Sequence, residues 1–92
     1  MINASGIIGT GAYLPSKKLN NLDLGKICKV SPKEILKKTG IKFRRIAQEN
    51  ETASSMGYNA SIQAIKNSKI NKSDIDMVIC CSFSGEYIYP AL

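Results

Sequence analysis

The clearest local signals in this chain lie in residues 31–47, Ser-Pro-Lys-Glu-Ile-Leu-Lys-Lys-Thr-Gly-Ile-Lys-Phe-Arg-Arg-Ile-Ala. Ser31 has the side chain of a helix N-cap, and Pro32 suits the first helical position, where its missing N–H costs nothing. Glu34 follows three residues after Ser31, so the two can form a capping box. Gly40 provides the end, because glycine adopts the left-handed conformation past a helix without steric cost. The pattern predicts a short helix from Pro32 to about Lys38.

Positive charge is concentrated around this helix. The 92 residues carry a net charge of +6, and ten of the thirteen basic residues lie between Lys17 and Arg45, with only Asp23 and Glu34 against them. A basic region of this kind suggests an anionic partner, which could be a phosphorylated small molecule, an acidic protein or nucleic acid. A solvated, lysine-rich surface is an equally good interpretation, because lysine outnumbers arginine eleven to two.

Residues 6–15 begin as an apolar, β-branched strand that glycines interrupt and Pro15 ends. Gly9 and Gly11 suggest a dinucleotide-binding turn, but Leu14 stands where the third glycine of that motif belongs, and Pro15 argues against a helix starting there. The better interpretation is that glycine lets another backbone approach this segment closely.

The middle of the chain reads as alternating short elements. Residues 16–20 are predicted to be a polar, basic loop, followed by a helix from Leu22 to about Cys28 that Asn21 caps. Residues 41–47 alternate apolar and basic side chains, which predicts an extended segment with one buried and one positive face.

The second half predicts one long helix and one strand. Residues 52–67 place small side chains on one stripe and larger apolar ones on the opposite side, which predicts a helix covered on two sides. Residues 77–81, Met-Val-Ile-Cys-Cys, form a continuous apolar run typical of a parallel strand buried on both faces. The resulting order of strand, helices and strand is a βαβ unit with parallel strands. Since a lone parallel pair is not a stable sheet, we expect an α/β protein of which this chain is an incomplete part.

Cysteine usage and hydropathy exclude several classes of protein. The three cysteines, Cys28, Cys80 and Cys81, are odd in number and the chain has no histidine, so neither a disulfide framework nor a metal site is predicted. They are expected to be small buried residues in a reducing compartment. No apolar run approaches the ~20 residues of a membrane span, and the N-terminus lacks the pattern of a signal peptide. These features predict a soluble, cytoplasmic protein without membrane contact.

Five stretches follow one another in an order and spacing that together are distinctive. They are Ile8-Gly-Thr-Gly-Ala-Tyr-Leu-Pro15, Asn21-Leu-Asp-Leu24, Thr39-Gly-Ile-Lys-Phe-Arg-Arg-Ile-Ala47, Glu51-Thr52 with Met56-Gly57, and Asp74-Ile-Asp-Met-Val-Ile79. In this register the chain resembles the β-ketoacyl-acyl-carrier-protein synthase III family of the thiolase superfamily over essentially all 92 residues. The resemblance implies that residues 1–92 are the N-terminal fragment of a thiolase-like condensing-enzyme domain, incomplete relative to its layered α-β-α-β-α architecture.

The resemblance also implies an activity. Members of the family condense an acyl-CoA primer with malonyl-acyl carrier protein to begin fatty acid synthesis, through a cysteine thioester, in cytosolic homodimers. Acyl-CoA and acyl carrier protein are then substrates, and no separate cofactor is implied. The cysteine nucleophile and its supporting His and Asn fall beyond Leu92, so this chain is expected to hold no catalytic residue and to be inactive alone. It would need a complementing C-terminal half or act within a homodimer.

Two positions match binding residues of the family. An aromatic and an arginine there hold the adenine of CoA, and the matching positions here are Glu34 and Lys38. Lys38 keeps the charge but lacks the flat guanidinium, whereas Glu34 offers no stacking surface. Tyr89 matches an aromatic that lines the partner's acyl pocket across the dimer. Lys38 and Tyr89 are therefore the substrate-binding candidates, and Cys28, Cys80 and Cys81 match structural positions.

Two other functions stay open at this point. A small basic module could bind nucleic acid or act structurally, although aromatic residues are too few and scattered for a stacking platform, which makes nucleic acid an unlikely partner. A related acyltransferase of the thiolase superfamily outside fatty acid synthesis is the other alternative.

Overall fold

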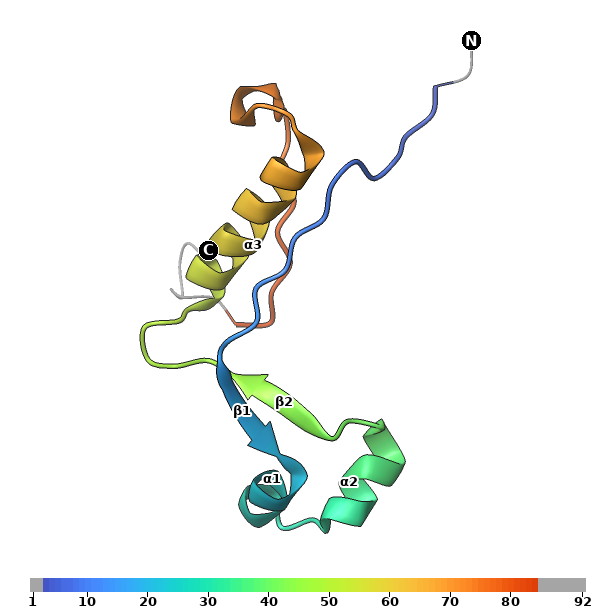
Figure 1. The fold of residues 1–92 in the computed structure, drawn as a ribbon, viewed down its shortest axis with the longest axis vertical. Coiled ribbons are helices and arrows are strands. Elements are labelled where there is room, and N and C mark those ends of the chain that lie inside the picture. Colours follow the sequence, from blue (N-terminus) through green and yellow to red (C-terminus); the bar gives the residue numbers. More distant parts are fainter. Residues whose placement is uncertain (1–2, 85–92) are drawn as a thin grey trace. The chain divides into compact units, whose positions relative to one another are not determined.

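The computed structural model describes residues 3–84, which form two compact units (Figure 1). Residues 14–51 make up the first, which we call the helix–ribbon unit. Residues 3–13 together with residues 52–84 make up the second, which we call the α3 unit. Each is described by itself.

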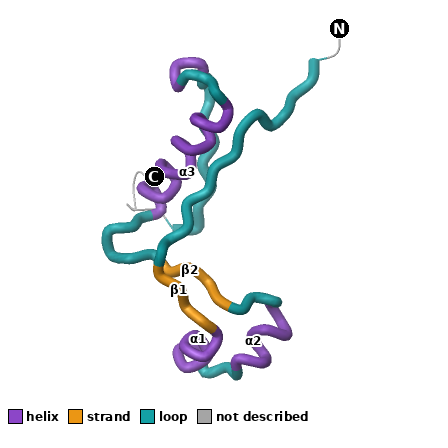
Figure 2. Tube along the Cα trace, viewed as in Figure 1, coloured by secondary structure: helices purple, strands orange, loops and turns teal. Residues whose placement is uncertain are grey.

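The helix–ribbon unit consists of two short strands and two short helices. In chain order these are β1 (Lys17–Asn20), α1 (Asn21–Cys28), α2 (Pro32–Thr39) and β2 (Phe43–Ile46). The strands pair antiparallel, with Lys17 opposite Ile46 and Asn20 opposite Phe43. Both helices lie between the strands in sequence, and Figure 2 shows them at the end of the ribbon where β1 stops and β2 starts.

The extended segment predicted at residues 41–47 is confirmed by β2, but the polar loop predicted at residues 16–20 is wrong, because residues 17–20 form β1. Lys-Lys-Leu-Asn carries only one apolar side chain, Leu19, so its composition has no strand signal of its own. Pairing with β2 supplies the backbone hydrogen bonds that make it a strand, and this pairing joins residues that are far apart in the sequence.

Local capping determines both short helices. α2 begins and ends as predicted: Ser31 Oγ accepts from the backbone N–H of Glu34, and Gly40 closes the helix with a φ of 69°. The start of α1 differs, because Asn20 rather than Asn21 is the N-cap and accepts from the N–H of Asp23. The side chain of Asn21 instead donates to the carbonyl of Ile41, 2.8 Å away, and so joins α1 to the segment before β2.

The core of the helix–ribbon unit is small. Ile35 of α2, with 8% of its surface exposed, is the one buried aliphatic side chain of a Leu, Ile or Val among residues 3–84. Gly25 of α1 is also buried, and its carbonyl accepts from the N–H of Val30 at 3.1 Å. The unit is therefore held by capping and by close backbone contacts as much as by apolar burial.

The α3 unit is built on one long helix, α3 (Ala53–Ser68), followed by the single 3-10 turn η1 (Lys72–Asp74). Thr52 caps α3 in a full capping box with Ser55, since the side-chain oxygen of each residue accepts from the backbone N–H of the other. The helix ends at Lys69 in the left-handed conformation, with a φ of 61°. The helix predicted from residues 52–67 is confirmed.

Residues 9–12 run along α3, as Figure 1 illustrates. The amide of Asn67 donates to the carbonyl of Thr10, and the N–H of Ala12 donates to the side-chain oxygen of Gln63, both at 2.9 Å. A Cβ added to Gly9 would lie 2.6 Å from the carbonyl oxygen of Ala64. The prediction that glycine permits close backbone approach is confirmed, and the approaching backbone is that of α3.

The parallel strand pair predicted from residues 6–15 and 77–81 is not formed among the described residues, where the one sheet is the antiparallel pair of β1 and β2. Both segments are extended but make no ladder, and their apolar side chains face solvent, with Ile7 87% and Ile79 86% exposed. α3 likewise has no buried residue. The prediction that other elements cover this helix on two sides is therefore wrong for the described residues. Parallel strands need neighbouring strands and two covering layers, which the described residues do not contain.

The architecture is thus a partial α/β unit with a two-stranded sheet. None of the helices within residues 3–84 combines the length and the apolar character that crossing a membrane requires.

Candidate functional site

Lys38, one of the two substrate-binding candidates predicted from the sequence, lies on α2, and the structure places it in direct contact with Glu34. Lys38 Nζ lies 2.9 Å from a carboxylate oxygen of Glu34, one helical turn away. Both side chains remain accessible, with 72% of Lys38 and 46% of Glu34 exposed. An exposed pair of this spacing contributes only about 0.3–0.5 kcal/mol, so Lys38 can exchange this partner for a ligand at small cost.

This ion pair replaces one half of the predicted capping box. The bond from the Glu34 N–H to Ser31 Oγ is present at 3.2 Å, but the carboxylate of Glu34 turns toward Lys38 instead of the Ser31 backbone. The physical reason is the i,i+4 spacing, in which a glutamate preceding a lysine is the favourable order along the helix. Glu34 therefore covers part of the charge on Lys38.

Two further cationic side chains of the helix–ribbon unit are engaged within the unit. Arg45 donates to the carbonyl of Pro15 at 2.8 Å, and the ammonium of Lys18 lies 4.8 Å from the centre of the Phe43 ring. Sequence reasoning missed both contacts. They follow from the antiparallel register, which places Lys18 and Arg45 opposite each other and Phe43 on the same face of the ribbon.

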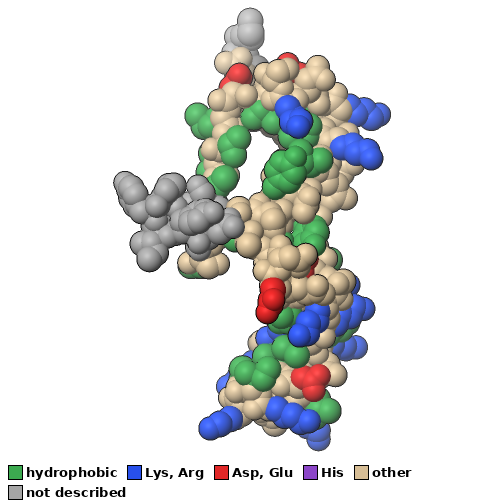
Figure 3. Space-filling model, turned by 90° about the vertical axis from the view of Figure 1, so that its left-hand side faces the viewer, with side chains coloured by type: hydrophobic (Ala, Val, Ile, Leu, Met, Phe, Trp, Pro, Cys, Tyr) green, Lys and Arg blue, Asp and Glu red, His purple; other side chains and the backbone are tan. Residues whose placement is uncertain are grey.

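Net charge divides between the units as the sequence predicted. The helix–ribbon unit contains ten basic and four acidic residues, a net charge of +6, while the rest of the chain is balanced. Figure 3 shows Lys and Arg side chains projecting around the lower part of the view, where this unit lies. Eight exposed lysines, which we call the lysine surface, account for most of this charge: Lys17, Lys18, Lys26, Lys29, Lys33, Lys37, Lys38 and Lys42.

The other predicted site residues are not brought to α2. Tyr89, the second substrate-binding candidate, lies outside the described residues. The prediction that the three cysteines are buried is wrong for the part of the chain that the structure describes: Cys28, Cys80 and Cys81 are free thiols and all are exposed. The apolar strand that should bury Cys80 and Cys81 lacks its covering layers here, which accounts for the difference.

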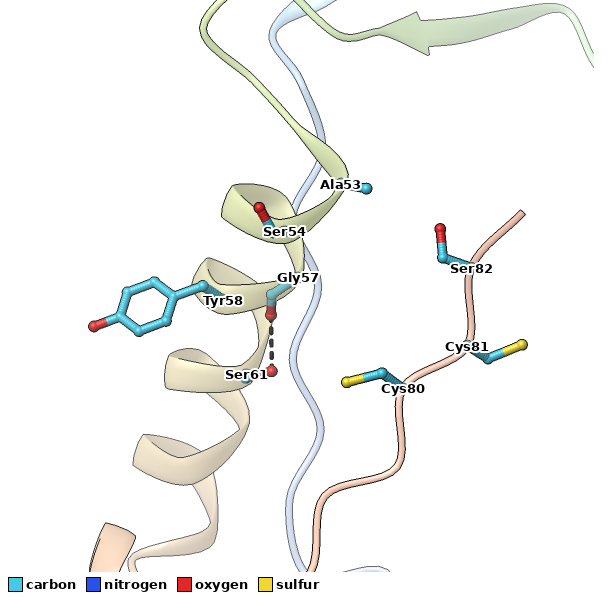
Figure 4. Close-up of a pocket in the computed structure, with 8 residues that line it drawn as sticks. All are labelled: Ala53, Ser54, Gly57, Tyr58, Ser61, Cys80, Cys81 and Ser82. Carbon is cyan, nitrogen blue, oxygen red and sulfur yellow. Dashed lines mark hydrogen bonds between the residues drawn. The ribbon is translucent and has the colours of Figure 1, made fainter. Parts of the chain in front are cut away.

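Cys80 lines a hollow of about 490 Å³ in the α3 unit. Its walls come from one face of α3 and the end of the extended segment, and the lining residues are Ala53, Ser54, Gly57, Tyr58, Ser61, Cys80, Cys81 and Ser82. Figure 4 shows the Cys80 sulfur directed toward α3, the Cys81 sulfur directed away from it, and the Tyr58 ring pointing away from residues 80–82. The hydroxyl of Ser61 is bonded to the carbonyl of Gly57 at 2.7 Å. The described residues that line the hollow are thus mostly small, with two cysteines and one tyrosine, and they include no Asp, Glu, Lys or Arg.

Comparisons with known proteins support the resemblance seen in the sequence. No protein-family model matches the chain. A β-ketoacyl-acyl-carrier-protein synthase III of Vibrio vulnificus is 47% identical over 87 residues, which are 95% of this chain and 28% of that protein. Among solved structures, the crystal structure of 3-oxoacyl-acyl-carrier-protein synthase III from Aquifex aeolicus matches with a TM-score of 0.69 and 44% identity, over 76% of this chain and 22% of that one.

A second solved structure comes from a different biosynthetic context. The priming β-ketosynthase of the R1128 polyketide pathway matches with a TM-score of 0.71 and 31% identity, over 76% of this chain and 21% of that one. The chain thus spans about a quarter of the length of the proteins it matches. By sequence and by fold, these 92 residues match part of the β-ketoacyl-acyl-carrier-protein synthase III enzymes, within the thiolase-like condensing enzymes.

Proposed function

We propose that residues 1–92 are the N-terminal part of a thiolase-like condensing-enzyme domain that starts fatty acid synthesis by joining an acyl-CoA primer to malonyl-acyl carrier protein. The observation that carries the proposal is the match at 47% identity over 87 residues to a β-ketoacyl-acyl-carrier-protein synthase III, together with the fold match. The complete enzyme acts in the cytoplasm as a homodimer or as this chain joined by a complementing C-terminal half.

The chemistry that such an enzyme performs needs a cysteine nucleophile and polar donors, which we assign to the part of the enzyme that this chain does not span. A cysteine thiolate attacks the thioester carbonyl of the primer and releases CoA, and loss of CO₂ from the malonyl group then supplies the carbanion that attacks the enzyme-bound acyl group. Neutral donors stabilise the oxygen that becomes negative. The 92 residues include no histidine, and the described residues that line the hollow at Cys80 include no Asp, Glu, Lys or Arg. The role of the 92 residues is to build the fold and part of the substrate entrance.

Lys38 is the residue of this chain that we assign to the substrate, as a cation for the phosphates of the CoA nucleotide. Its accessibility and its weak tie to Glu34 support the assignment. Removing Glu34's charge should strengthen the contact, because the carboxylate both occupies the ammonium and repels a phosphate.

A chimera tests the function and the assignment together. We expect the Vibrio vulnificus enzyme to keep condensing activity when its 87 matched residues are replaced by this chain. In that chimera, Lys38→Ala should raise the KM for acyl-CoA roughly fivefold, the equivalent of ~1 kcal/mol, and Glu34→Gln should lower it. Lys66 is an exposed lysine of the α3 unit, so Lys66→Ala is the matched control and should leave the KM for acyl-CoA unchanged. Loss of activity in a folded, dimeric chimera would contradict the function, and an unchanged KM in both α2 variants would contradict only the role of Lys38.

The isolated 92-residue chain should form no acyl-enzyme. Incubation with labelled acetyl-CoA, followed by mass spectrometry of the intact protein, should leave Cys28, Cys80 and Cys81 unmodified, because the chain has no histidine that could take the proton from a thiol. Alkylation with iodoacetamide is the control, since all three thiols are exposed and should react. A stoichiometric thioester at one cysteine would show that the chain carries its own nucleophile.

The match to the R1128 priming β-ketosynthase favours a second candidate, an acyltransferase of the same superfamily outside fatty acid synthesis. The same chimera distinguishes the two through the acyl carrier protein that the enzyme accepts.

A further inference from the structure

Asn21, the first residue of α1, has a side chain that is only half satisfied. Its amide nitrogen donates to the carbonyl of Ile41 at 2.8 Å, but its side-chain oxygen is buried and accepts no hydrogen bond. Within residues 3–84 it is the one buried side-chain atom of this kind. A buried oxygen without a partner lowers stability, and α1 does not need Asn21 as its cap, because Asn20 has that role. The amide at this position therefore has its use in the bond that it donates.

That bond reaches the end of α2. Ile41 lies just past the helix, and its N–H donates to Thr39 Oγ1 at 3.1 Å. Thr39 Oγ1 in turn donates to the carbonyl of Ile35, the buried residue of α2, at 2.6 Å. A continuous set of hydrogen bonds thus joins Asn21 on α1 to the last turn of α2, which is the turn that contains Lys38.

The same face of α1 also holds the start of α2. Gly25 lies one helical turn after Asn21, and its carbonyl accepts from the N–H of Val30, two residues before α2 begins. This contact depends on close backbone packing, since a Cβ at Gly25 would overlap the Val30 carbonyl oxygen. The restraint at the other end of α2 is a single side-chain bond from a half-buried residue. It can therefore be removed without changing the backbone contact at Gly25.

We propose, resting on the proposed function and on the role of Lys38 in it, that Asn21 is a positioning residue for the acyl-CoA substrate and acts through the end of α2. A lysine has a flexible stem, so the region that its ammonium can reach depends on where its backbone is held. The bond from Asn21 holds the backbone three residues after Lys38. Without it the last turn of α2 is free to move away from α1, and the ammonium is no longer held where it meets the phosphates.

The chain offers a matched pair of substitutions at neighbouring residues. Asn21→Asp removes the donor to the Ile41 carbonyl, whereas Asn20→Asp adds the same charge and keeps the acceptor that caps α1. In the chimera, Asn21→Asp should raise the KM for acyl-CoA roughly threefold with kcat changed less than about 1.5-fold, and Asn20→Asp should change neither constant. Asn21→Leu lacks both the donor and the unpartnered oxygen, so it should raise the KM to the same extent without lowering Tm.

A double substitution shows whether the effect acts through Lys38. In the Lys38→Ala chimera, Asn21→Asp should cause no further rise in the KM for acyl-CoA, since the group that it positions is gone. A rise that persists without the lysine, or a fall in kcat as large as the rise in KM, would overturn the positioning role. An active chimera whose KM responds to Lys38→Ala but to neither Asn21 variant would also overturn it and leave the proposed function standing.

Hydrogen exchange in the 92-residue chain tests the structural step independently of any activity. The amide of Gly40, bonded to the Leu36 carbonyl at 2.8 Å, reports on the end of α2. The amide of Ile35, bonded to the Ser31 carbonyl at 3.1 Å, reports on its start. Asn21→Asp should speed exchange at Gly40 on the order of fivefold and change that at Ile35 less than about twofold. Equal acceleration at both amides, or none at Gly40, would overturn the inference whether or not the chimera is active.

Discussion

Gly11→Ala should lower the stability of the α3 unit by roughly 2–3 kcal/mol, because the added methyl group has no space. It would overlap the carbonyl oxygen of Ala60 and lie 2.6 Å from the backbone nitrogen of Ala64. Both atoms belong to the backbone of α3 and cannot rotate away as a side chain could. The extended segment would have to lift from the helix and lose the bond between the N–H of Ala12 and Gln63.

Hydrogen exchange at Ala12 is the sharpest measurement of this effect. We expect its amide to exchange about 30- to 150-fold faster in Gly11→Ala, the factor that corresponds to 2–3 kcal/mol. Gly6→Ala is the control, since a Cβ at Gly6 meets no atom within 4 Å, and its exchange rates should match those of the unmodified chain. If Gly11→Ala behaved like Gly6→Ala, the segment would not lie against α3 in solution.

Among substitutions that add a single methyl group to the helix–ribbon unit, Gly25→Ala should lower the free energy of unfolding the most. Within a helix, alanine is ordinarily favoured over glycine by about 1 kcal/mol, so propensity alone predicts stabilisation. Gly25 is buried, however, and an added Cβ would overlap the carbonyl oxygen of Val30, where the chain turns from α1 to α2. We therefore expect the opposite sign, a loss of about 2 kcal/mol.

Urea unfolding monitored by far-ultraviolet circular dichroism measures this loss, which in a domain of this size corresponds to a drop in Tm on the order of 10 °C. The control is Lys26→Ala, the next residue of α1, whose exposed side chain should be replaceable within about 0.5 kcal/mol. A stabilised Gly25→Ala variant would show that the turn after α1 is not held as close as the structure has it.

Short-range features were predictable because their causes lie within a few residues. The start and end of α2 depend on Ser31, Pro32 and Gly40, all adjacent to the helix they delimit. The close approach at Gly9 and Gly11 was also predictable in kind, since glycine removes the one atom that would prevent it. The segment that approaches, α3, could not be deduced from those glycines alone.

The candidate site shows the same division. The position of Lys38 on α2 follows from helix spacing, and its contact with Glu34 follows from the same i,i+4 rule. The competition between that contact and the second half of the capping box is decided by the energies of two alternative partners for one carboxylate. Sequence spacing allows both, and only the three-dimensional arrangement selects the ion pair.

The sequence by itself determined the helices, the concentration of positive charge between Lys17 and Arg45, and the resemblance to the synthase III family, because these depend on residue type, local spacing and ordered motifs. Tertiary structure alone decided that residues 17–20 form a strand, that Asn20 rather than Asn21 caps α1, and that Arg45 and Phe43 are engaged. It also left residues 77–81 extended and exposed instead of in a parallel sheet. The physical reason is that strand pairing and burial are satisfied by partners distant in the chain, which no local pattern specifies.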